Sequence, residues 1–563
     1  MPAAVHLLLA AGCAAAAAVP VGAAPRDSQP AMADDDMAAA ASATTIARIS
    51  TVMADGKHSV AESVFDWRTE HCADGRPLGS SGKPYRRDVP DAPAMAWRDP
   101  ASNLTYVAPG DSRGTWPSIG PSLDEVKHDC GTMIFNYSGQ TGFLQPASDF
   151  SSHEWLYAPY VVPGAGGENA TLYMLAHNEF HGWEHPGLCN ATRMVQGRCW
   201  YNAVGLSVSH DGGRNIRHIA PPPHHLVAAS PDVYVPDHGA YGVFSPSQIV
   251  SFKGWLYSFP RCRSKDGGSS GVCIMRIQEG DLHDPSAWRF WRGGGEDSFT
   301  GRFADPYSSD HSAAAEPAIL AFGAANDTAS PSQPVPRWLP QQQLLVMVGF
   351  ANMPTGHGPG GHFGWSVAKA PWGPWTKMLP IEDVDVNPTK DVGAIRGLYP
   401  SLLDPNSPSL NYDTIVGDTA YVYWVQGRNK TAVAPCPDMA RDLWRQKVRI
   451  SFEEQTAEKT EKTDKSTVAA GSSAKKECVY HNNTDYWGGD LLHSGVEFRN
   501  VTAVDYKHCG ALCIATEACR SFTYDANSQW PCGNKCCWLK GLVNASMTHE
   551  HEGAWSGLCG PKK

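Results

Sequence analysis

A short pattern, in which a proline is followed by a small or aromatic residue and then by aliphatic residues, recurs five times between about residues 60 and 452. Each copy is followed by a turn and by a second, strongly apolar run. Short apolar runs joined by Gly, Pro and Asp turns are typical of antiparallel strands. The pattern therefore predicts a repeated β-sheet unit. The copies are Trp116-Pro117-Ser118-Ile119, Ala158-Pro159-Tyr160-Val161, Ser245-Pro246-Ser247 with Ile249-Val250, Glu316-Pro317-Ala318-Ile319 and Tyr399-Pro400-Ser401-Leu402.

The copies are about 40 to about 90 residues apart, which fits four-stranded blades whose loops differ in length. Radial repetition also leaves only short sheet edges exposed. The 54 glycines and 43 prolines favour many turns over long helices. We predict a mainly β fold, a five-bladed β-propeller over residues 60–452, with six blades as the alternative.

The repeats, together with Ser366-Val367-Ala368 and Gly373-Pro374-Trp375, resemble the five-bladed β-propeller glycosidases of family 43 and related types. That resemblance covers about 350 residues. In the family, an Asp precedes the Pro of the first blade, an Asp follows the Pro of the second, and a Glu lies just before the Pro of the third. The matching residues here are Trp116, Tyr160 and Ser245, so the catalytic set of the family does not carry over. The segment 209–216 also resembles an Asp-box, a structural hairpin of sialidase-like propellers.

Other carboxylates near the predicted strand ends are candidates for catalysis. Glycoside hydrolysis needs two carboxyl groups across the scissile bond, about 5 to 10 Å apart. A neighbouring imidazole shifts a carboxyl pKa toward catalytic values, and Glu179 is flanked by His177 and His181. The alternative for each is a solvated or turn-bonded carboxylate. The candidates are Glu316, Glu179, Glu154 and Asp305, with Asp310 beside Asp305.

Histidine and aromatic side chains near the same strand ends are candidates for substrate binding, because they hydrogen-bond sugar hydroxyls or stack on sugar faces. They are His177, His181, Trp183, Tyr160 and Tyr399, and the alternative for the aromatic ones is a place in the blade core. The run from His177 to His185 also suggests a metal site, since alternate residues of a strand face the same side and can present several ligands together. Three ligands from one strand seldom complete such a site, so we predict no metal. We also predict no cofactor, because the sequence lacks a phosphate loop and a dinucleotide fingerprint.

The first 24 residues are apolar and rich in alanine, and they resemble a secretory signal peptide. Residues 25–59 are of low complexity, and we expect them to be disordered. Fifteen of the 16 cysteines follow the signal segment, and nine Asn-x-Ser/Thr sequons fit a glycoprotein. We therefore expect an extracellular, secreted protein without a membrane span. A net charge of −11 without a basic block argues against a nucleic-acid partner.

Seven cysteines are spread over the large region, so at least one is left unpaired or pairs with another molecule. We expect Cys189 to pair with Cys199 and Cys262 with Cys273, because each pair closes a short loop between adjacent strands. A Cys72–Cys130 bond is a weaker expectation.

Residues 453–477 are rich in Glu, Lys, Thr and Ser, and they read as a flexible linker to a cysteine-dense segment, residues 478–560. This segment resembles a PAN/apple domain, a small disulfide-rich α+β fold: a predicted helix leads to Cys509 and Cys513, a Cys519-x-x-Phe-x-Tyr strand follows, and then a Cys537-Trp-Leu-Lys strand. In that resemblance the first and last cysteines close the ends. The cysteines expected in disulfides here are Cys478, Cys509, Cys513, Cys519, Cys537 and Cys559.

Apple domains bind proteins or carbohydrates, so the resemblance implies binding rather than catalysis. Two hypotheses follow for the whole chain. In the first, it is a secreted carbohydrate-interacting protein, a glycoside hydrolase acting through funnel carboxylates, with glycans or glycoproteins as partners and a further protein partner for the apple domain. In the second, it is a non-catalytic adhesion or recognition protein.

Overall fold

The structure is a computed structural model. It describes residues 43–72, 88–110, 115–134, 145–164, 170–190, 198–267, 270–309, 316–323, 331–351, 362–390, 395–428 and 440–455 of the large region. In the C-terminal region it describes mainly residues 476–486, 521–525, 536–540 and 548–561. The predicted signal peptide, most of the predicted linker, Asp310 and Cys436 lie outside the described residues. No helix among the described residues is long and apolar enough to cross a membrane.

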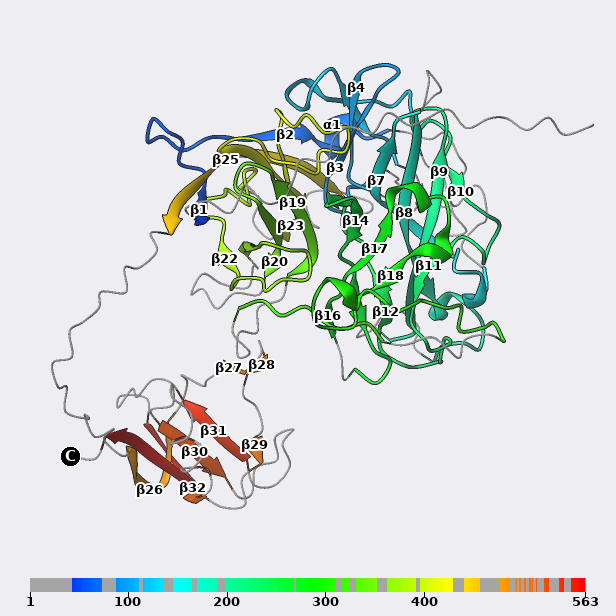
Figure 1. The fold of residues 1–563 in the computed structure, drawn as a ribbon. Helices are drawn as coiled ribbons and strands as arrows, with labels where there is room; N and C mark the ends of the chain where they lie inside the picture. The colour runs from blue at the N-terminus through cyan, green and yellow to red at the C-terminus, as the bar shows by residue number, and fades with distance from the viewer. Residues whose placement is uncertain are drawn as a thin grey trace, which may run out of the picture.

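The large region is built from sheets arranged like the blades of a propeller (Figure 1). The first sheet contains β3 (Met95–Asp99), β4 (Leu104–Ala108), β5 (Ser118–Gly120) and β6 (Lys127–His128). The second contains β7 (His153–Val162), β8 (Thr171–His181), β9 (Trp200–Ser209) and β10 (Arg217–His218), and it is extended by β11 (Leu226–Ala229), β12 (Tyr241–Phe244), β15 (Arg261–Arg263) and β16 (Ser270–Val272).

The third sheet contains β13 (Val250–Phe252), β14 (Trp255–Ser258), β17 (Met275–Gln278) and β18 (Arg289–Phe290). The fourth contains β19 (Ser332–Leu339), β20 (Leu344–Ala351), β21 (His362–Ala368) and β22 (Leu379–Pro380). The last contains β23 (Ile395–Leu403), β24 (Thr419–Gly427), β25 (Arg441–Gln455) and β1 (Ala43–Ser50), and β2 (Ala61–Phe65) also pairs with β25. The mainly β, propeller-like fold is thus confirmed, while the number of blades stays a prediction.

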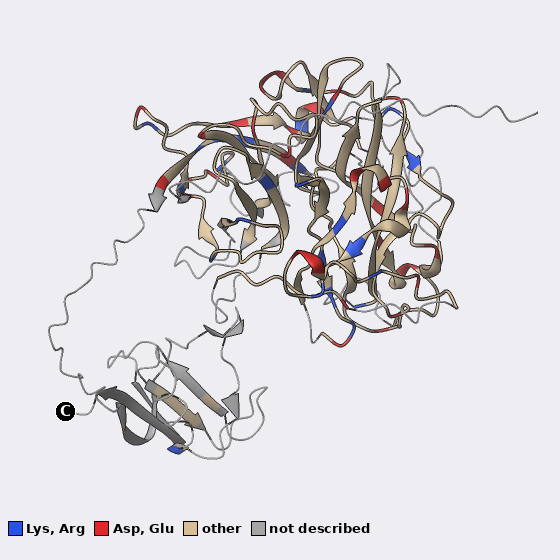
Figure 2. Cartoon of the chain, viewed as in Figure 1, with Lys and Arg blue, Asp and Glu red and all other residues tan. Residues whose placement is uncertain are grey.

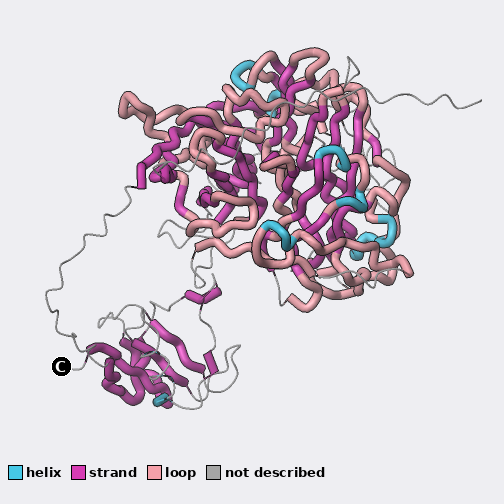
Figure 3. Tube along the Cα trace, viewed as in Figure 1, coloured by secondary structure: helices cyan, strands magenta, loops and turns pink. Residues whose placement is uncertain are grey.

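In the part of the large region that the structure describes, helical structure is limited to single turns, which Figure 3 shows as short cyan pieces among the strands. The described ones are α1 (Trp67–Glu70) and the 3₁₀ turns η1 (Leu123–Glu125), η3 (Ala147–Asp149), η5 (Gly182–Glu184), η7 (Glu279–Asp281), η8 (Pro285–Ala287) and η9 (Glu296–Ser298). In Figure 2, Lys and Arg are interspersed with Asp and Glu over the described part of this region.

The ring is closed by pairing between the two ends of the large region. Strand β1 runs antiparallel to β25, with Ala43 opposite Gln455 and Ser50 opposite Arg449. Ile46 and Ile49 of β1 are buried in the core of this sheet. We had expected residues 25–59 to be disordered, yet the structure places residues 43–59 in the propeller. The prediction was based on the alanine-rich first part of that segment and overlooked the β-branched residues at its end, such as Thr44, Thr45 and Ile46, which favour a strand.

Four residues that directly precede a proline have left-handed backbone angles, and they mark the first strands of four sheets. They are Ala158 (φ 49°), Ser245 (φ 41°), Gln333 (φ 53°) and Tyr399 (φ 56°). The strand pairing shifts register across Ala158, Gln333 and Tyr399, as at a β-bulge. Such an L-residue conformation is uncommon and costs energy, so its repetition identifies equivalent positions.

Two of the five predicted copies do not lie at the first strand of a sheet. The copy at residues 316–320 lies outside the described strands, and the fourth sheet instead begins with β19, which carries Gln333-Pro334-Val335. The copy at Trp116-Pro117 leads into β5, the third strand of its sheet. The first strand there is β3, which follows Ala92-Pro93-Ala94. The Pro-aliphatic pattern was too permissive to separate first strands from later ones.

A buried polar network ties the sheets together at the centre. Gln248 donates from Nε2 to the carbonyls of Ala96 and Asn411, and its Oε1 accepts from Arg337 Nη2 at 2.8 Å. Arg337 on β19 also donates to the carbonyl of Leu402 on β23. Asn411 accepts from the backbone N–H of Val161 on β7. Burial lowers the pKa of Arg337 to about 9. These contacts join different sheets to one another or to the loops before β13 and between β23 and β24, so the network fixes the ring.

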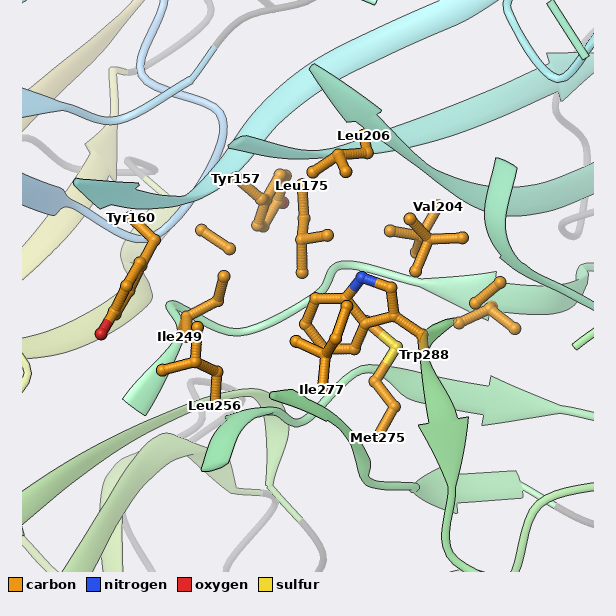
Figure 4. Packing of buried hydrophobic residues seen from close by; sticks show 14 of the residues in the cluster. Tyr157, Tyr160, Leu175, Val204, Leu206, Ile249, Leu256, Met275, Ile277 and Trp288 are labelled. Carbon is orange, nitrogen blue, oxygen red and sulfur yellow. The ribbon is translucent and has the colours of Figure 1, made fainter. Parts of the chain in front are cut away.

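Apolar cores fill the spaces between neighbouring sheets. Figure 4 shows the core between the second and third sheets, where Leu175, Val204 and Leu206 face Ile277 and Trp288. All five side chains are buried. Burial of this kind is the main favourable contribution to stability, at about 25 cal/mol per Å² of apolar surface.

All three disulfides expected in the large region are present: Cys72–Cys130, Cys189–Cys199 and Cys262–Cys273. In the C-terminal region, the sheet has the order β26 (Lys476–Tyr486), β32 (Thr548–Pro561), β30 (Ser521–Asp525), β31 (Cys536–Lys540) and β29 (Val501–Thr502), beside the hairpin β27 (Leu492–His493) and β28 (Val496–Glu497). The predicted strands at 519–524 and 537–540 correspond to β30 and β31, and Cys509 bonds to Cys537. Cys478 and Cys513 are also disulfide-bonded.

Candidate functional site

A cavity of about 610 Å³ lies where the left-handed positions of several sheets meet. Ser245, Gln333 and Tyr399 line it, together with Tyr157, the residue before Ala158. Ala158, Gln333 and Tyr399 lie at register shifts in their strands, and a β-bulge of this kind turns a side chain away from the regular alternation. We call this space the funnel cavity. Its lining residues are Asp91, Trp155, Tyr157, His177, Glu179, His181, Trp200, Ala240, Phe244, Ser245, Arg261, Arg263, Gln333, Phe350, Leu398, Tyr399 and Arg441.

Asp91 is the carboxylate that is most firmly held in the funnel cavity. Its Oδ1 accepts from the Tyr399 hydroxyl at 3.0 Å and forms an ion pair with Arg441, and its Oδ2 accepts from Trp155 Nε1 at 3.2 Å. The Arg441 guanidinium also lies 6.0 Å from the centre of the Tyr399 ring. Burial and the Asp91 charge raise the pKa of Tyr399, so its hydroxyl stays protonated and donates to the carboxylate.

Glu179 is the second carboxylate of the funnel cavity, and it lies between two histidines of its own strand, β8. Its Oε2 is 2.9 Å from His181 Nε2, and its Oε1 is 3.6 Å from His177 Nδ1. Its side chain is 13% exposed. Alternate residues of a strand share a face, which is why these three side chains gather there. His177 is further fixed by Asn202 Oδ1, 3.0 Å from its Nε2.

A further carboxylate, Glu184, contacts two histidines beside Glu179, His153 and His181. It contacts His153 Nε2 at 2.6 Å and His181 Nδ1 at 3.5 Å. Burial lowers the pKa of His181, but hydrogen bonds to Glu179 and Glu184 outweigh burial and raise that pKa above its usual value. Burial lowers the pKa of His153 and of His177. The funnel cavity thus has one imidazole that is readily protonated beside one that stays neutral.

Among the described residues, two clusters without disulfide-bonded cysteines have donor sets that suit a metal ion. One consists of His153, His181 and Glu184, and the other of Glu154, His218 and His225. In each, the ligand atoms lie within 4.8 Å of one another. Both clusters are joined by internal contacts of imidazole to carboxylate, so neither needs an ion to satisfy its buried charge.

Of the predicted catalytic residues, the structure places only Glu179 at the funnel cavity. Glu154 is fully buried on the opposite face of the β7–β8 pair, in contact with His218 and His225. Asp305 accepts from the backbone N–H of Tyr307 in a turn. Glu316 is exposed, and partial desolvation with the nearby Asp232 and Asp266 raises its pKa. The predicted acids are therefore not brought together around one cavity.

The predicted substrate-binding residues divide in a similar way. His177, His181 and Tyr399 line the funnel cavity. Trp183 stacks on His181 with ring centres 4.3 Å apart, just behind the lining. Tyr160 instead lies at a separate hollow of about 500 Å³ and donates to Glu279 at 3.1 Å.

Sequence reasoning missed Asp91, Arg441 and the pair Arg261 and Arg263. A signal for Asp91 was present, because Asp91-Ala92-Pro93-Ala94-Met95 follows the same Pro-aliphatic pattern as the other first strands. With this copy in place of Trp116, the first sheet has an acidic residue close to its proline. Tyr160 and Ser245 still stand where the family resemblance expects acids. Arg441 has no comparable signal, since it meets Asp91 only when the ring closes.

Comparison with known proteins identifies one domain. A family model described as a PAN domain matches residues 484–540, in agreement with the resemblance stated above. No curated protein matches the chain in sequence.

Among solved structures, the catalytic domain of a GH62 α-L-arabinofuranosidase from Coprinopsis cinerea aligns over 69% of this chain and 97% of its own, with 10% identity and a TM-score of 0.35. An endo-arabinase from Bacteroides thetaiotaomicron aligns over 66% and 96%, with 10% identity and a TM-score of 0.35. An N-acetylgalactosamine deacetylase from F. plautii aligns over 68% and 94%, with 13% identity and a TM-score of 0.36.

Proposed function

We propose that the chain is an exported carbohydrate-binding protein, in which a five-bladed propeller holds a glycan in the funnel cavity and the PAN domain attaches the protein to a protein or glycan partner. The observation that carries the proposal is the funnel cavity itself, where charged and aromatic side chains from separate sheets converge. Its volume of about 610 Å³ falls in the range of small-ligand sites. The disulfides of both regions support export, because such bonds persist in oxidising compartments.

The lining suits a sugar because it combines flat apolar surfaces with fixed polar groups. Trp155, Trp200 and Phe244 offer aromatic surface, and the rings of Trp200 and Phe244 are held edge to face at 5.8 Å. Asp91 and Glu179 offer acceptors whose orientation is fixed by their own partners. Sugar hydroxyls bind such preoriented acceptors, while the apolar faces of the ring stack on aromatic side chains.

Hydrolysis of a glycosidic bond is the second candidate function, and one observation favours it. Asp91 and Glu179 both line the funnel cavity, so the two carboxylates face a common space. In this hypothesis Glu179 gives a proton to the glycosidic oxygen as the bond to the anomeric carbon breaks. Asp91 takes a proton from the water whose oxygen adds to that carbon. The cycle closes when Asp91 releases this proton to solvent and Glu179 takes one up from solvent through His181.

Binding and hydrolysis are separated by a glycan-array screen of the full chain, followed by turnover assays with Asp91→Asn and Glu179→Gln. If the protein hydrolyses its ligand, each variant should keep binding while turnover falls about 10²- to 10⁴-fold. Asp305→Asn and Glu316→Gln are matched controls, since both carboxylates lie outside the funnel cavity. Binding without turnover in the parent protein supports the non-catalytic function. Failure of the parent protein to bind any glycan overturns the proposal.

A further inference from the structure

The rim of the funnel cavity carries two arginines that the mechanism above does not use. Arg261 and Arg263 lie on β15, and both side chains are exposed. They alternate with Cys262, which is buried in the core and bonded to Cys273. Because residues i and i+2 of a strand point to the same side, the inward cysteine turns both guanidinium groups toward the cavity.

The charges of the remaining lining residues are balanced within the protein. Arg441 pairs with Asp91, and Glu179 pairs with His181. In the part of the chain that the structure describes, neither Arg261 nor Arg263 has a carboxylate partner. Arg261 donates from Nη2 to Ser270 Oγ at 3.4 Å, and this contact carries no negative charge. The funnel cavity therefore has an uncompensated positive charge at its rim.

The two arginines are close enough to repel each other. Partial desolvation, together with the charge of Arg263, lowers the pKa of Arg261. Gly242 lies opposite Arg263 on β12 and Phe244 lies opposite Arg261, so β12 offers no acid to either of them. A side chain at Gly242 is ruled out, because its Cβ would lie 2.1 Å from the Asn202 carbonyl oxygen. The strand pairing thus places no side chain opposite Arg263 and an aromatic ring opposite Arg261.

We propose that the funnel cavity selects anionic saccharides, whose carboxylate or sulfate group is bound by Arg261 and Arg263 while the sugar ring packs against Phe244. This inference rests on the proposed glycan-binding function. The planar guanidinium forms paired hydrogen bonds with planar carboxylates and with other oxyanions, which suits both a uronic acid and a sulfated sugar. A neutral sugar would leave the two like charges without a counterion.

The test measures the affinity of the full chain for matched polysaccharide pairs. One pair is polygalacturonate and its carboxyl-reduced product, and the other is a sulfated galactan and its desulfated product. We expect the anionic member of at least one pair to bind about tenfold or more tightly than its neutral partner, with a preference that weakens as salt is added. The two pairs distinguish a carboxylate from a sulfate as the recognised group.

The double variant Arg261→Gln/Arg263→Gln should lose this preference and keep its affinity for the neutral member. The double variant Arg217→Gln/Arg292→Gln removes the same charge from exposed positions outside the funnel cavity and should keep it. Equal binding of both members by the parent protein, or an unchanged preference in the Arg261/Arg263 variant, overturns the inference but leaves glycan binding intact. Absence of binding to every glycan overturns both proposals.

Discussion

Two glutamates of adjacent strands have the same kind of partners and opposite surroundings. Glu179 of β8 and Glu154 of β7 each contact two histidines. In the strand pairing, Glu179 lies opposite His153, and Glu154 lies opposite Asn178. Since directly opposed residues share a face and neighbours along a strand do not, the two carboxylates lie on opposite faces of one sheet.

The difference in surroundings indicates different roles: Glu179 is accessible to a ligand, whereas Glu154 stabilises the fold. Glu179 is partly exposed at the funnel cavity, whereas Glu154 is fully buried. The Glu154 side chain lies close to Gly205 of β9, which has no side chain to block its contact with His225. A glutamate between histidines is therefore no evidence of a functional site until its face of the sheet is known.

Among the variants that test this difference between the two faces, Glu154→Ala should have the largest effect on stability. The change removes the buried carboxylate that both His218 and His225 contact, and it opens a void. We expect the free energy of unfolding to fall by about 3–5 kcal/mol, as measured by urea denaturation. Glu179→Ala is the matched control and should cost less than about 1 kcal/mol, because the Glu179 side chain is partly exposed at the funnel cavity. Equal losses for the two variants would contradict the distinction between the two faces.

The face that each glutamate occupies was only partly predictable from sequence. The alternation of His177, Glu179 and His181 places all three on one side of β8, and the structure confirms this grouping at the funnel cavity. Which side of the sheet faces the cavity depends on the bulge at Ala158, a left-handed residue before a proline. No composition or spacing rule predicts that conformation, since a residue before proline is normally extended.

Long-range closure accounts for most of what the sequence left unpredicted at the site. Asp91 and Arg441 meet across 350 residues of chain, through a ring that closes only when β1 pairs with β25. The three disulfides and the PAN domain were predictable because their signals are local or tied to cysteine spacing. Three of the five blade repeats lead into first strands, whereas Trp116-Pro117 leads into the third strand of its sheet and the copy at residues 316–320 lies outside the described strands.

A smaller effect is expected from Gly205→Ala, which acts on the buried side alone. A Cβ at this position would lie 2.6 Å from Cδ2 and 3.0 Å from Nε2 of His225. The imidazole has to move, so we expect a loss of about 1–3 kcal/mol in the free energy of unfolding and no change in glycan affinity. Gly280→Ala is the control, because a Cβ there meets nothing within 4 Å. A change in glycan affinity without a stability loss would show that the two faces are coupled.

The smallest effect, about 1 kcal/mol or less, is a difference in pH dependence between the two faces. Burial raises the pKa of Glu154, but the effect of His218 and His225 is larger and lowers that pKa below 4.5. The stability that the Glu154 carboxylate contributes is therefore present above pH 4.5 and is lost as the pH falls through the folded pKa. The pKa of His181 is raised above 6.5, so its contribution is present below pH 6.5 and is lost as the pH rises through the folded pKa. Urea denaturation across this range should show that the cost of Glu154→Gln disappears in acid, whereas the cost of His181→Asn disappears in base. The same pH dependence for both variants would mean that Glu154 and His181, despite lying on opposite faces, titrate as one network.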